Sequence, residues 1–387
     1  MQVSDISAIP VTVPLDPIES GGIAPYRTNH GELSEMDRIL VRVETDEGYV
    51  GWGEVRAFLS PEATVSVIED GVAPLVEGQS PFEREKLRRQ VFIEYTNANM
   101  FLAPVETACW DIVGKVLERP VYELLGGWTA DHQTTMKHRE HVERGDDSRQ
   151  VEFAYALGIF SPEASREYAS RVHEAGYSVL KTKGGRDWRE DVERIRAMHD
   201  AVDGQLEFRI DPNQGWTVED AVRVASLLED DGIYLQYMEQ PIRVDNHGSL
   251  ASLRSRTRQP IAANEDTYIP RNMRAMIDAG AIDVGVLDLT PAGGISGLRR
   301  LAAIGEDGGI SLAHHCAFDL GIRTAAILHT VYSTPALNLP SDTAYFGWEA
   351  DVIESPFTVE DAQMTVPDEP GLGITVDMDA VDRYRQD

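Results

Sequence analysis

The chain is poor in cysteine, in positive charge and in long hydrophobic runs, and each shortage excludes a class of protein. Its two cysteines, Cys109 and Cys316, are too few and too far apart for the disulfide framework of a small secreted domain, and they fit a reducing compartment. No uninterrupted apolar stretch approaches the roughly 18 residues of a membrane-spanning helix. The first residues also lack a basic segment followed by an apolar run, so we expect a soluble, cytoplasmic protein.

The charge balance is strongly acidic. The 387 residues include 65 acidic and 35 basic side chains, which gives a net charge of −30. The acidic residues are dispersed through segments with regular apolar periodicity, so they indicate a folded protein with an acidic surface. Such a surface repels nucleic acid and anionic membranes, and we expect neither as a partner. Because high salt screens the repulsion between like charges, the composition predicts a salt-adapted source.

Residues 1 to about 125 have the pattern of an α+β domain, and the apolar content of 42% is ample for its core. The acidic and glycine residues at 46–48 supply the turn of a hairpin between two of its strands. The predicted strands are Val3–Val13, Arg38–Glu44 and Tyr49–Trp52, and the predicted helices are Pro61–Ile68, Pro81–Phe92 and Val105–Leu117.

From about residue 150, short strands alternate with helical segments such as Pro162–Ala175 and Arg189–Val202. The strands are predicted near residues 152–157, 177–181, 206–211, 234–238, 260–263, 282–287, 309–313 and 335–339. Eight strands with crossovers between them predict an α/β fold, a closed parallel (β/α) barrel. Short β-like pieces at 357–359 and 373–376 are expected to return to the first domain.

We therefore divide the chain into an α+β capping domain at 1–128, a barrel at 129–340 and a C-terminal segment at 341–387. The long polar connection at 129–150 carries His138 and His141, and a solvated excursion explains it better than a metal site because no carboxylate or cysteine pattern completes one. The loop Gly21–Arg27 either faces a ligand or is a plain surface loop.

The pair Lys181 and Lys183 is the first candidate for chemistry, because the chain contains only five lysines. Residues two apart in a strand point to the same face, so both ammonium groups are predicted to project from one side. Like charges held close together disfavour double protonation, which would let one lysine act as a base near neutral pH. The alternative is a pair of solvated surface lysines.

Three carboxylates, Asp211, Glu239 and Glu265, each follow a predicted barrel strand, about one strand and helix apart. Polar residues at the C-terminal ends of barrel strands are catalytic candidates. One such acid would usually cap the next helix, but three in register beside a lysine pair indicate a metal site. Three oxygen ligands without cysteine or histidine suit Mg²⁺ better than Zn²⁺.

An acid and an imidazole are predicted across the barrel mouth from these groups. Asp288 follows the sixth predicted strand, and His314 and His315 follow the seventh. A carboxylate beside an imidazole fixes its tautomer and raises its basicity. Because successive strand residues face opposite ways, only one of the two histidines can point into the mouth. The glycine-rich stretch Ala292–Gly297 either cradles a phosphate at a helix N-terminus or forms a tight turn.

Taken together, these residues resemble the enolase superfamily, in its mandelate racemase and muconate lactonising branch. The likeness covers nearly the whole chain, through the motifs Trp110–Lys115, Pro120–Gly127, Lys181–Lys183, Asp211–Asn213, Glu239–Pro241, Asn264–Asp266 and Asp288 with His315. It implies a (β/α)7β barrel with an N-terminal α+β capping domain that the C-terminal segment completes. Such enzymes are usually homo-oligomers, and we expect the same here.

The resemblance also implies roles for the candidate residues. Mg²⁺ would be held by Asp211, Glu239 and Glu265. Lys183 would be one general base, with Lys181 modulating its pKa. His315, paired with Asp288, would be the second acid/base group.

Departures from the family's patterns separate its branches. Muconate cycloisomerases and dipeptide epimerases carry a lysine base after strand six, where this chain has Asp288. Another group of sugar-acid dehydratases carries a histidine where Asn213 stands, and mandelate racemase uses a glutamate after strand eight, near Asp342 here. Tyr26 and Arg27 are further substrate candidates. We expect substrate specificity to lie in the loop near Gly21–His30, the stretch Arg56–Pro61 and the end of strand eight.

We therefore expect an acid-sugar dehydratase that acts on an aldonate or aldarate and forms a 2-keto-3-deoxy acid. The alternatives are a racemase or epimerase of a 2-hydroxy acid at the same site, and a non-catalytic barrel that binds a metal or a sugar acid. A pure binder has no need of bases on both faces of its ligand, which disfavours the last alternative.

Overall fold

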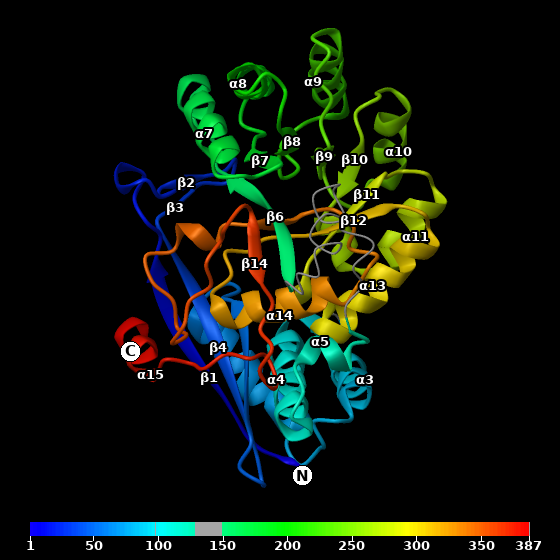
Figure 1. Ribbon diagram of the computed structural model, residues 1–387. Helices are drawn as coiled ribbons and strands as arrows, with labels where there is room; N and C mark the ends of the chain where they lie inside the picture. Colours follow the sequence, from blue (N-terminus) through cyan, green and yellow to red (C-terminus); the bar gives the residue numbers. More distant parts are fainter. Residues whose placement is uncertain (97, 128–148, 387) are drawn as a thin grey trace.

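A computed structural model describes residues 1–96, 98–127 and 149–386. His138 and His141, with most of the connection that carries them, lie outside these residues. Figure 1 shows an N-terminal part, blue and cyan, beneath a barrel whose strands run from green to orange. The predicted combination of a capping domain and a barrel is confirmed.

Three antiparallel strands form the sheet of the capping part, in the order β1, β4, β5. These are β1 (Val3–Pro14), β4 (Glu35–Thr45) and β5 (Val50–Arg56), with the short pair β2 (Tyr26–Arg27) and β3 (Glu32–Leu33) beside the barrel mouth. Alternate residues of β4, including Val41 and Val43, share a hydrophobic cluster with Val105 and Cys109 of the helix α4. The period-two pattern therefore located this sheet correctly.

The helix α4 crosses the sheet closely because β5 has glycines beneath it. A Cβ atom on Gly53 would lie 1.9 Å from the carbonyl oxygen of Pro104. The helix begins before that proline, earlier than predicted. The helical segments of this part are α1 (Pro61–Ser66), η2 (Val67–Val72), α2 (Ala73–Val76), α3 (Arg84–Glu94), α4 (Asn99–Leu117) and α5 (Val121–Leu124).

Eight strands form the barrel, and every hydrogen-bonded neighbouring pair among them is parallel. The order is β12, β11, β10, β9, β8, β7, β6, β13. Their bounds are β6 (Gln150–Leu157), β7 (Val179–Lys183), β8 (Glu207–Asp211), β9 (Tyr237–Glu239), β10 (Ile261–Ala263), β11 (Val284–Leu287), β12 (Ser311–His314) and β13 (Ser341–Thr343).

The predicted eighth strand at 335–339 is wrong, because the chain there forms a turn and the strand is β13 (Ser341–Thr343). The prediction followed the apolar residues around Leu337, whereas β13 is entirely polar and carries a charged side chain into the barrel. The turn still helps to close the ring, since the Leu339 N–H donates to the Leu312 carbonyl at 3.0 Å. The domain limits at 128 and 340 stay predictions.

Helices cover the outside of the barrel between successive strands (Figure 1). They are α7 (Pro162–Glu174), α8 (Trp188–Ala201), α9 (Val218–Asp230), α10 (His247–Ser255), α11 (Pro270–Asp278), α12 (Leu289–Ala292), α13 (Ile295–Asp307) and α14 (Gly321–Tyr332). Short 3-10 turns are η1 (Ile18–Ser20), η3 (Glu265–Tyr268) and η4 (Tyr345–Gly347). None of the helices in the described ranges is long and apolar enough to cross a membrane.

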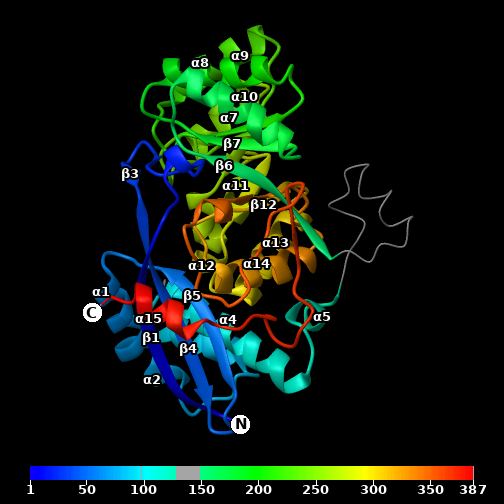
Figure 2. The same cartoon turned by 60° about the vertical axis from the view of Figure 1, so that its left-hand side comes forward.

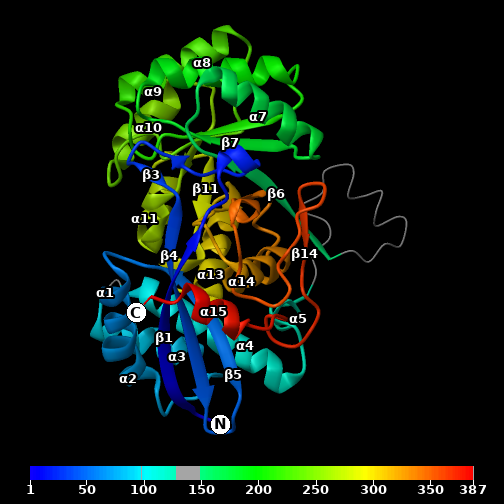
Figure 3. The same cartoon turned by 90° about the vertical axis from the view of Figure 1, so that its left-hand side faces the viewer.

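The C-terminal segment passes the barrel and then reaches the capping sheet, as Figures 2 and 3 show in red. Its strand β14 (Gln363–Thr365) pairs antiparallel with β6, and its helix α15 (Met378–Tyr384) lies beside β1. The Gln386 N–H donates to the Pro10 carbonyl at 3.0 Å, which fixes this end. The β-like pieces predicted at 357–359 and 373–376 are not strands; Val376 makes only an isolated bridge to Ile353.

Candidate active site

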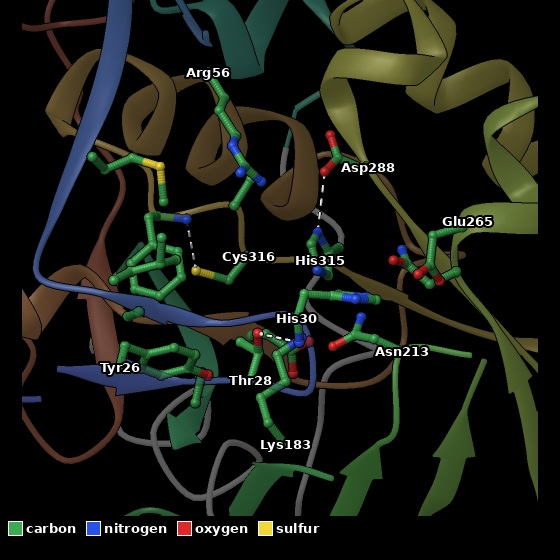
Figure 4. Close-up of a pocket in the computed structure, with 18 of the residues that line it drawn as sticks. Tyr26, Thr28, His30, Arg56, Lys183, Asn213, Glu265, Asp288, His315 and Cys316 are labelled. Atoms are coloured by element: carbon green, nitrogen blue, oxygen red, sulfur yellow. Dashed lines mark hydrogen bonds and ion pairs between the residues drawn. The ribbon is translucent and has the colours of Figure 1, made fainter. Parts of the chain in front are cut away.

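A cavity of about 570 Å³ lies where the capping part meets the C-terminal ends of the barrel strands. Barrel strand ends supply its charged wall, and the capping part closes it with residues from the loop at β2 and β3 and from the end of β5. Figure 4 shows Lys183 and Asn213 on one side of this cavity, with Arg56 and Asp288 on the other. The cavity therefore lies at the strand ends where the candidate residues were expected to gather.

Both lysines of β7 point into the barrel mouth. The Lys183 ammonium lies 2.5 Å from Asp211 Oδ2, and the Lys181 ammonium lies 2.6 Å from Glu239 Oε2 and 2.8 Å from Asp342 Oδ2. Burial lowers the pKa of Lys181, but the carboxylates of Asp342, Glu239 and Asp211 raise it further, so the net pKa lies well above the usual value. The carboxylates therefore outweigh the like-charge effect that the lysine spacing predicts, and Lys181 stays charged.

The first two predicted metal ligands, Asp211 and Glu239, lie side by side and are fully buried. Burial raises the pKa of Asp211, yet the ammonium groups of Lys183 and Lys181 hold it well below its ordinary range. Burial and the nearby charge of Asp211 raise the pKa of Glu239 to about 8. Two adjacent carboxylates thus carry very different proton affinities, as expected for like charges that share a site.

The oxygen atoms at this point fit a hard divalent cation. Glu239 Oε1 and Glu265 Oε2 are buried without a hydrogen-bond partner among the described residues, and Glu239 Oε2 contacts the Lys181 ammonium at 2.6 Å. One ligand atom each from Asp211, Glu239 and His315 lie within 4.8 Å of one another. Glu265 follows β10 and lines the cavity, but its Oε1 accepts a hydrogen bond from Gln214 at 3.1 Å. Unpaired buried carboxylate oxygens are unfavourable unless a cation satisfies them.

The predicted acid and imidazole form a pair. His315 Nδ1 lies 3.1 Å from Asp288 Oδ2, and both residues line the cavity (Figure 4). Burial raises the pKa of Asp288, but the Arg323 guanidinium and the His315 ring hold it well below its ordinary value. Since Asp288 is therefore ionised, Nδ1 carries the proton and donates it, which leaves Nε2 as the ring's second reactive position.

His314 points the other way. Its Nε2 accepts a hydrogen bond from the Leu289 N–H at 3.3 Å, and the side chain is fully buried. Burial, helped by the charge of Arg323, lowers its pKa to about 3. His314 is therefore neutral and does not line the cavity.

Asp342 of β13 lines the cavity, and its carboxylate lies between two cations. Its Oδ2 accepts from Lys181, and its Oδ1 accepts from the buried Arg209 guanidinium at 2.7 Å. Burial raises its pKa, but Lys181 and Arg209 lower it below the ordinary value. Arg209 is a residue that sequence reasoning missed, although it lies two positions before Asp211 and so faces the same side of its strand.

The remaining substrate candidates separate into two groups. Tyr26 is 2% exposed and lines the cavity with Asn213, so part of the loop Gly21–Arg27 does face the site. The Arg27 guanidinium pairs with Glu32 at 3.0 Å and does not line the cavity. His30, at the end of the loop that was expected to influence specificity, also lines it and lies near Lys183 and Asn213 in Figure 4.

Arg56, the last residue of β5, projects into the cavity from the capping side (Figure 4). Its guanidinium makes no hydrogen bond or ion pair with any residue that the structure describes. Burial, assisted by the positive charge of Arg38, lowers its pKa. An unpaired guanidinium at the cavity wall is a ready partner for an anionic group of a ligand.

The glycine-rich stretch Ala292–Gly297 does not cradle a phosphate. The buried Glu106 carboxylate from α4 occupies that position, where it accepts hydrogen bonds from the Ile295 N–H at 2.8 Å and the Ser296 N–H at 3.2 Å. A Cβ atom on Gly294 would lie 2.2 Å from Glu106 Oε2. The glycine therefore makes room for a carboxylate that caps α13, which ties the capping part to the barrel.

Comparison with known families covers both parts of the chain. Residues 16–126 match the model of the mandelate racemase / muconate lactonizing enzyme N-terminal domain, and residues 163–380 match the model described as enolase C-terminal domain-like. The two matches fall on the capping part and on the barrel with its C-terminal extension.

Three relatives show the range of activities among similar proteins. The N-succinyl-L-Arg/Lys racemase of Bacillus cereus is 29% identical over 92% of this chain and 92% of its own length. The D-xylonate dehydratase of Haloferax volcanii is 26% identical over 98% of this chain and 93% of its own. A dipeptide epimerase from Enterococcus faecalis, solved with Mg and the dipeptide L-Leu-L-Tyr, is 25% identical with a TM-score of 0.84, covering 97% of this chain and all of that one.

Proposed function

The chain belongs to the mandelate racemase and muconate lactonizing enzyme family of the enolase superfamily, and from this premise we propose that it is an Mg²⁺-dependent acid-sugar dehydratase. Its substrate is an aldonate or aldarate, and its product is a 2-keto-3-deoxy acid. The observation that carries this proposal is the contact of His315 Nδ1 with Asp288 Oδ2 at 3.1 Å, across the mouth from Lys183.

That pair favours a hydroxy-acid reaction over the chemistry of the lysine-based branches. A histidine held by an ionised carboxylate can donate a proton to a departing hydroxyl group and can also accept one. In contrast, β11 ends at Leu287 and is followed by Asp288, so no lysine stands there. Lysine and histidine on different sides of one cavity provide an acid and a base for the same substrate carbon chain.

Asp211, Glu239 and Glu265 would hold the Mg²⁺ ion. When bound, the ion would supply positive charge that binds the substrate carboxylate and lowers the pKa of the α-proton. Lys181, which stays charged, adds a second fixed cation beside these oxygens. Electrostatic stabilisation of this kind acts on the negative charge that develops as the α-proton leaves.

The proton transfers fall to the two flanking groups. Lys183, in its neutral form, takes the proton from C2 of the acid, and the C–H electron pair passes into an enediolate. His315 donates its Nε2 proton to the 3-hydroxyl group, the C3–O bond breaks, and water leaves. The resulting enol then tautomerises to the 2-keto-3-deoxy acid. Asp288 keeps the imidazole ring oriented through both steps.

Arg56 favours a substrate with a second anionic group. It is an unpaired cavity cation that the capping part contributes, away from the carboxylate ligands and near Asp288 (Figure 4). A diacid such as an aldarate could place one carboxylate at the metal ligands and the other at this guanidinium. We therefore place aldarates ahead of aldonates as substrates.

The second candidate function is racemisation or epimerisation at the same site. It is favoured by the similarity to the N-succinyl-L-Arg/Lys racemase, which extends over 92% of this chain. The two reactions share the first proton transfer. They differ in whether the flanking acid returns a proton to C2 or gives one to a leaving hydroxyl.

A substrate screen with purified protein and Mg²⁺ tests the proposal. Aldaric and aldonic acids are incubated in parallel, and keto-acid formation is followed by its semicarbazone absorbance while C2 exchange is followed by NMR in D₂O. We expect keto acid from one or more aldarates. Exchange or inversion at C2 without keto acid would favour the racemase, and neither reaction with any 2-hydroxy or N-acylamino acid would contradict catalysis at this site.

A further inference from the structure

A network of buried charged side chains connects the capping sheet to His315. Its members are Arg38 on β4, Glu54 on β5, Asp319 in the segment after β12, Arg323 on α14, and Asp288 after β11. None of the five is more than 5% exposed. The family chemistry described above requires only the last of them.

At the capping end of this network, one guanidinium contacts several groups. The Arg38 guanidinium binds Glu54 Oε1 at 2.7 Å, donates to the Ala317 carbonyl at 2.9 Å and lies 3.4 Å from Asp319 Oδ1. Glu54 in turn accepts from the Leu320 N–H at 2.9 Å and from the Arg323 N–H at 2.8 Å. A capping-domain carboxylate therefore sits at the N-terminus of the barrel helix α14, where the helix dipole favours negative charge.

At the barrel end, the network contacts the acid/base pair directly. The Arg323 guanidinium binds Asp319 Oδ1 with one terminal nitrogen and Asp288 Oδ1 with the other, the latter at 2.6 Å. Asp288 Oδ2 then meets His315 Nδ1. Because a guanidinium is planar with a rigid fork, fixing one of its nitrogens on Asp319 also fixes the angle at which the other meets Asp288.

A second tie between the two parts shows what a purely structural contact looks like. Glu106 of α4 caps α13 in the same way that Glu54 of β5 caps α14. It accepts hydrogen bonds from the Ile295 N–H, the Ser296 N–H and hydroxyl, and the Trp110 indole, and none of these partners reaches a catalytic candidate. Only the Glu54 tie continues through charged groups into the cavity.

We propose that Arg38 and Glu54 of the capping domain, acting through Asp319 and Arg323, are positioning residues that hold the Asp288–His315 pair. The proposal rests on the role given to His315 above. Correct seating of the capping sheet on α14 then sets the orientation of the imidazole, so the acid side of the reaction is assembled only when the two domains are docked. Among the residues that the structure describes, none connects Lys183 to the capping sheet in this way.

The first experiment needs no substrate. Protein labelled with [¹⁵N]histidine gives an Nδ1–H correlation for His315, which the His315→Asn variant identifies by its disappearance. We expect the signal in the wild type and in Glu106→Gln, and its loss or broadening in Glu54→Gln and in Arg323→Lys. Arg38→Lys, which keeps the charge but cannot form the fork, serves if Glu54→Gln does not fold.

Three spectral outcomes would overturn the proposal. They are an unchanged signal in every variant, an equal loss in Glu106→Gln, and no such signal in the wild type. Each is readable whether or not a substrate has been found, so a failure of the proposed dehydration does not obscure the result.

Kinetics with the substrate supply the second readout. In Glu54→Gln and Arg323→Lys we expect kcat to fall about 10-fold or more with KM within about 2-fold, because the affected group acts in the transition state. Glu106→Gln should leave both constants within about 2-fold while lowering the melting temperature. Equal kinetic losses in Glu54→Gln and Glu106→Gln would show that docking acts on the site as a whole and would contradict positioning of His315.

Discussion

The lysine side and the histidine side of the cavity are built in different ways. On the lysine side, Lys181 and Lys183 directly contact carboxylates from the barrel strands β8, β9 and β13. On the histidine side, His315 is held by Asp288, which is held by Arg323, and that guanidinium is connected to the capping sheet.

The difference shows that one site can combine side chains held by nearby strands with side chains held by contacts between two domains. Strand alternation and parallel pairing suffice to bring the lysines to their carboxylates. The histidine side needs two domains in register, because its supporting charges come from separate parts of the chain. We therefore expect changes in the capping domain to affect the histidine side selectively.

The largest expected effect comes from removing either acid/base group. Lys183→Ala and His315→Asn should each lower kcat for keto-acid formation by about 10²- to 10⁴-fold, the usual contribution of general acid–base catalysis. Turnover is measured at saturating acid and Mg²⁺. A Lys183→Ala variant that keeps full turnover would end the assignment of the lysine side as the base.

Metal binding should distinguish the two sides next. Glu239→Gln removes a carboxylate whose Oε1 has no hydrogen-bond partner among the described residues, and we expect Mg²⁺ affinity by calorimetry to weaken about 100-fold or more. Asp288→Asn is the matched control on the histidine side and should change affinity less than about 3-fold. Equal losses in both variants would contradict the assignment of ligands to the lysine side alone.

The two sides should also differ in how they make the free energy of unfolding depend on pH. The pKa of Glu239 is raised to about 8 in the folded protein, so its contribution to stability is fully present below its unfolded value and is lost as pH rises through 8. With EDTA present, we expect the free energy of unfolding to fall between pH 5 and 8 by up to a few kcal/mol, since one pKa unit is worth about 1.4 kcal/mol.

Two variants test whether Glu239 causes this dependence of the free energy of unfolding on pH. Glu239→Gln should remove most of the slope. Asp288→Asn should keep it, because the pKa of Asp288 is lowered, so its contribution is present above the unfolded value and is lost only as the solution becomes more acidic. Unfolding in urea at several pH values measures both, and a slope that survives Glu239→Gln would rule out this carboxyl group as its source.

Arg56 should affect specificity more than chemistry. Arg56→Gln is expected to raise KM for an aldarate about 10- to 100-fold, the worth of a charge-assisted hydrogen bond, while kcat changes little. The KM for the corresponding aldonate, which lacks the second carboxylate, should stay within about 3-fold. Equal effects on the two acids would contradict recognition of the distal carboxylate by Arg56.

The smallest effect is expected at Arg27, which pairs with Glu32 at the surface and does not line the cavity. Arg27→Gln should change the free energy of unfolding by no more than about 0.5 kcal/mol, as for most exposed pairs. Turnover and KM should match the wild type. A marked rise in KM would show that Arg27 moves into the cavity when substrate binds.

The sequence was sufficient to predict the features that depend on strand periodicity and on position along the chain. Lys181 and Lys183 share a face because they lie two apart in a strand, and Asp211 and Glu239 meet because successive parallel strands end at one rim. The pair of Asp288 and His315 could be predicted for the same reason. These are local rules, and they hold wherever the strands are recognised.

Other features could not be predicted because they depend on tertiary packing. The eighth strand was misplaced since its residues are polar, and only the charged barrel interior around Asp342 explains that composition. The stretch that begins at Arg56 was expected to influence specificity, but that its guanidinium lines the cavity without a partner depends on how the capping sheet packs on the barrel. The contact of Arg38 with Asp319 joins residues 281 positions apart, beyond the reach of any periodic pattern.

The central claim is that Lys183 and His315 act on one substrate from different sides of the cavity, Lys183 as the base at C2 and His315 as the acid at the 3-hydroxyl group. Incubation of the substrate acid in D₂O with the wild type, Lys183→Ala and His315→Asn measures this directly, through exchange of the α-proton by NMR and through keto-acid formation. We predict that Lys183→Ala loses both exchange and keto acid, whereas His315→Asn still exchanges the α-proton but forms keto acid more slowly by about 100-fold or more. Loss of α-proton exchange in both variants alike would contradict this division of roles.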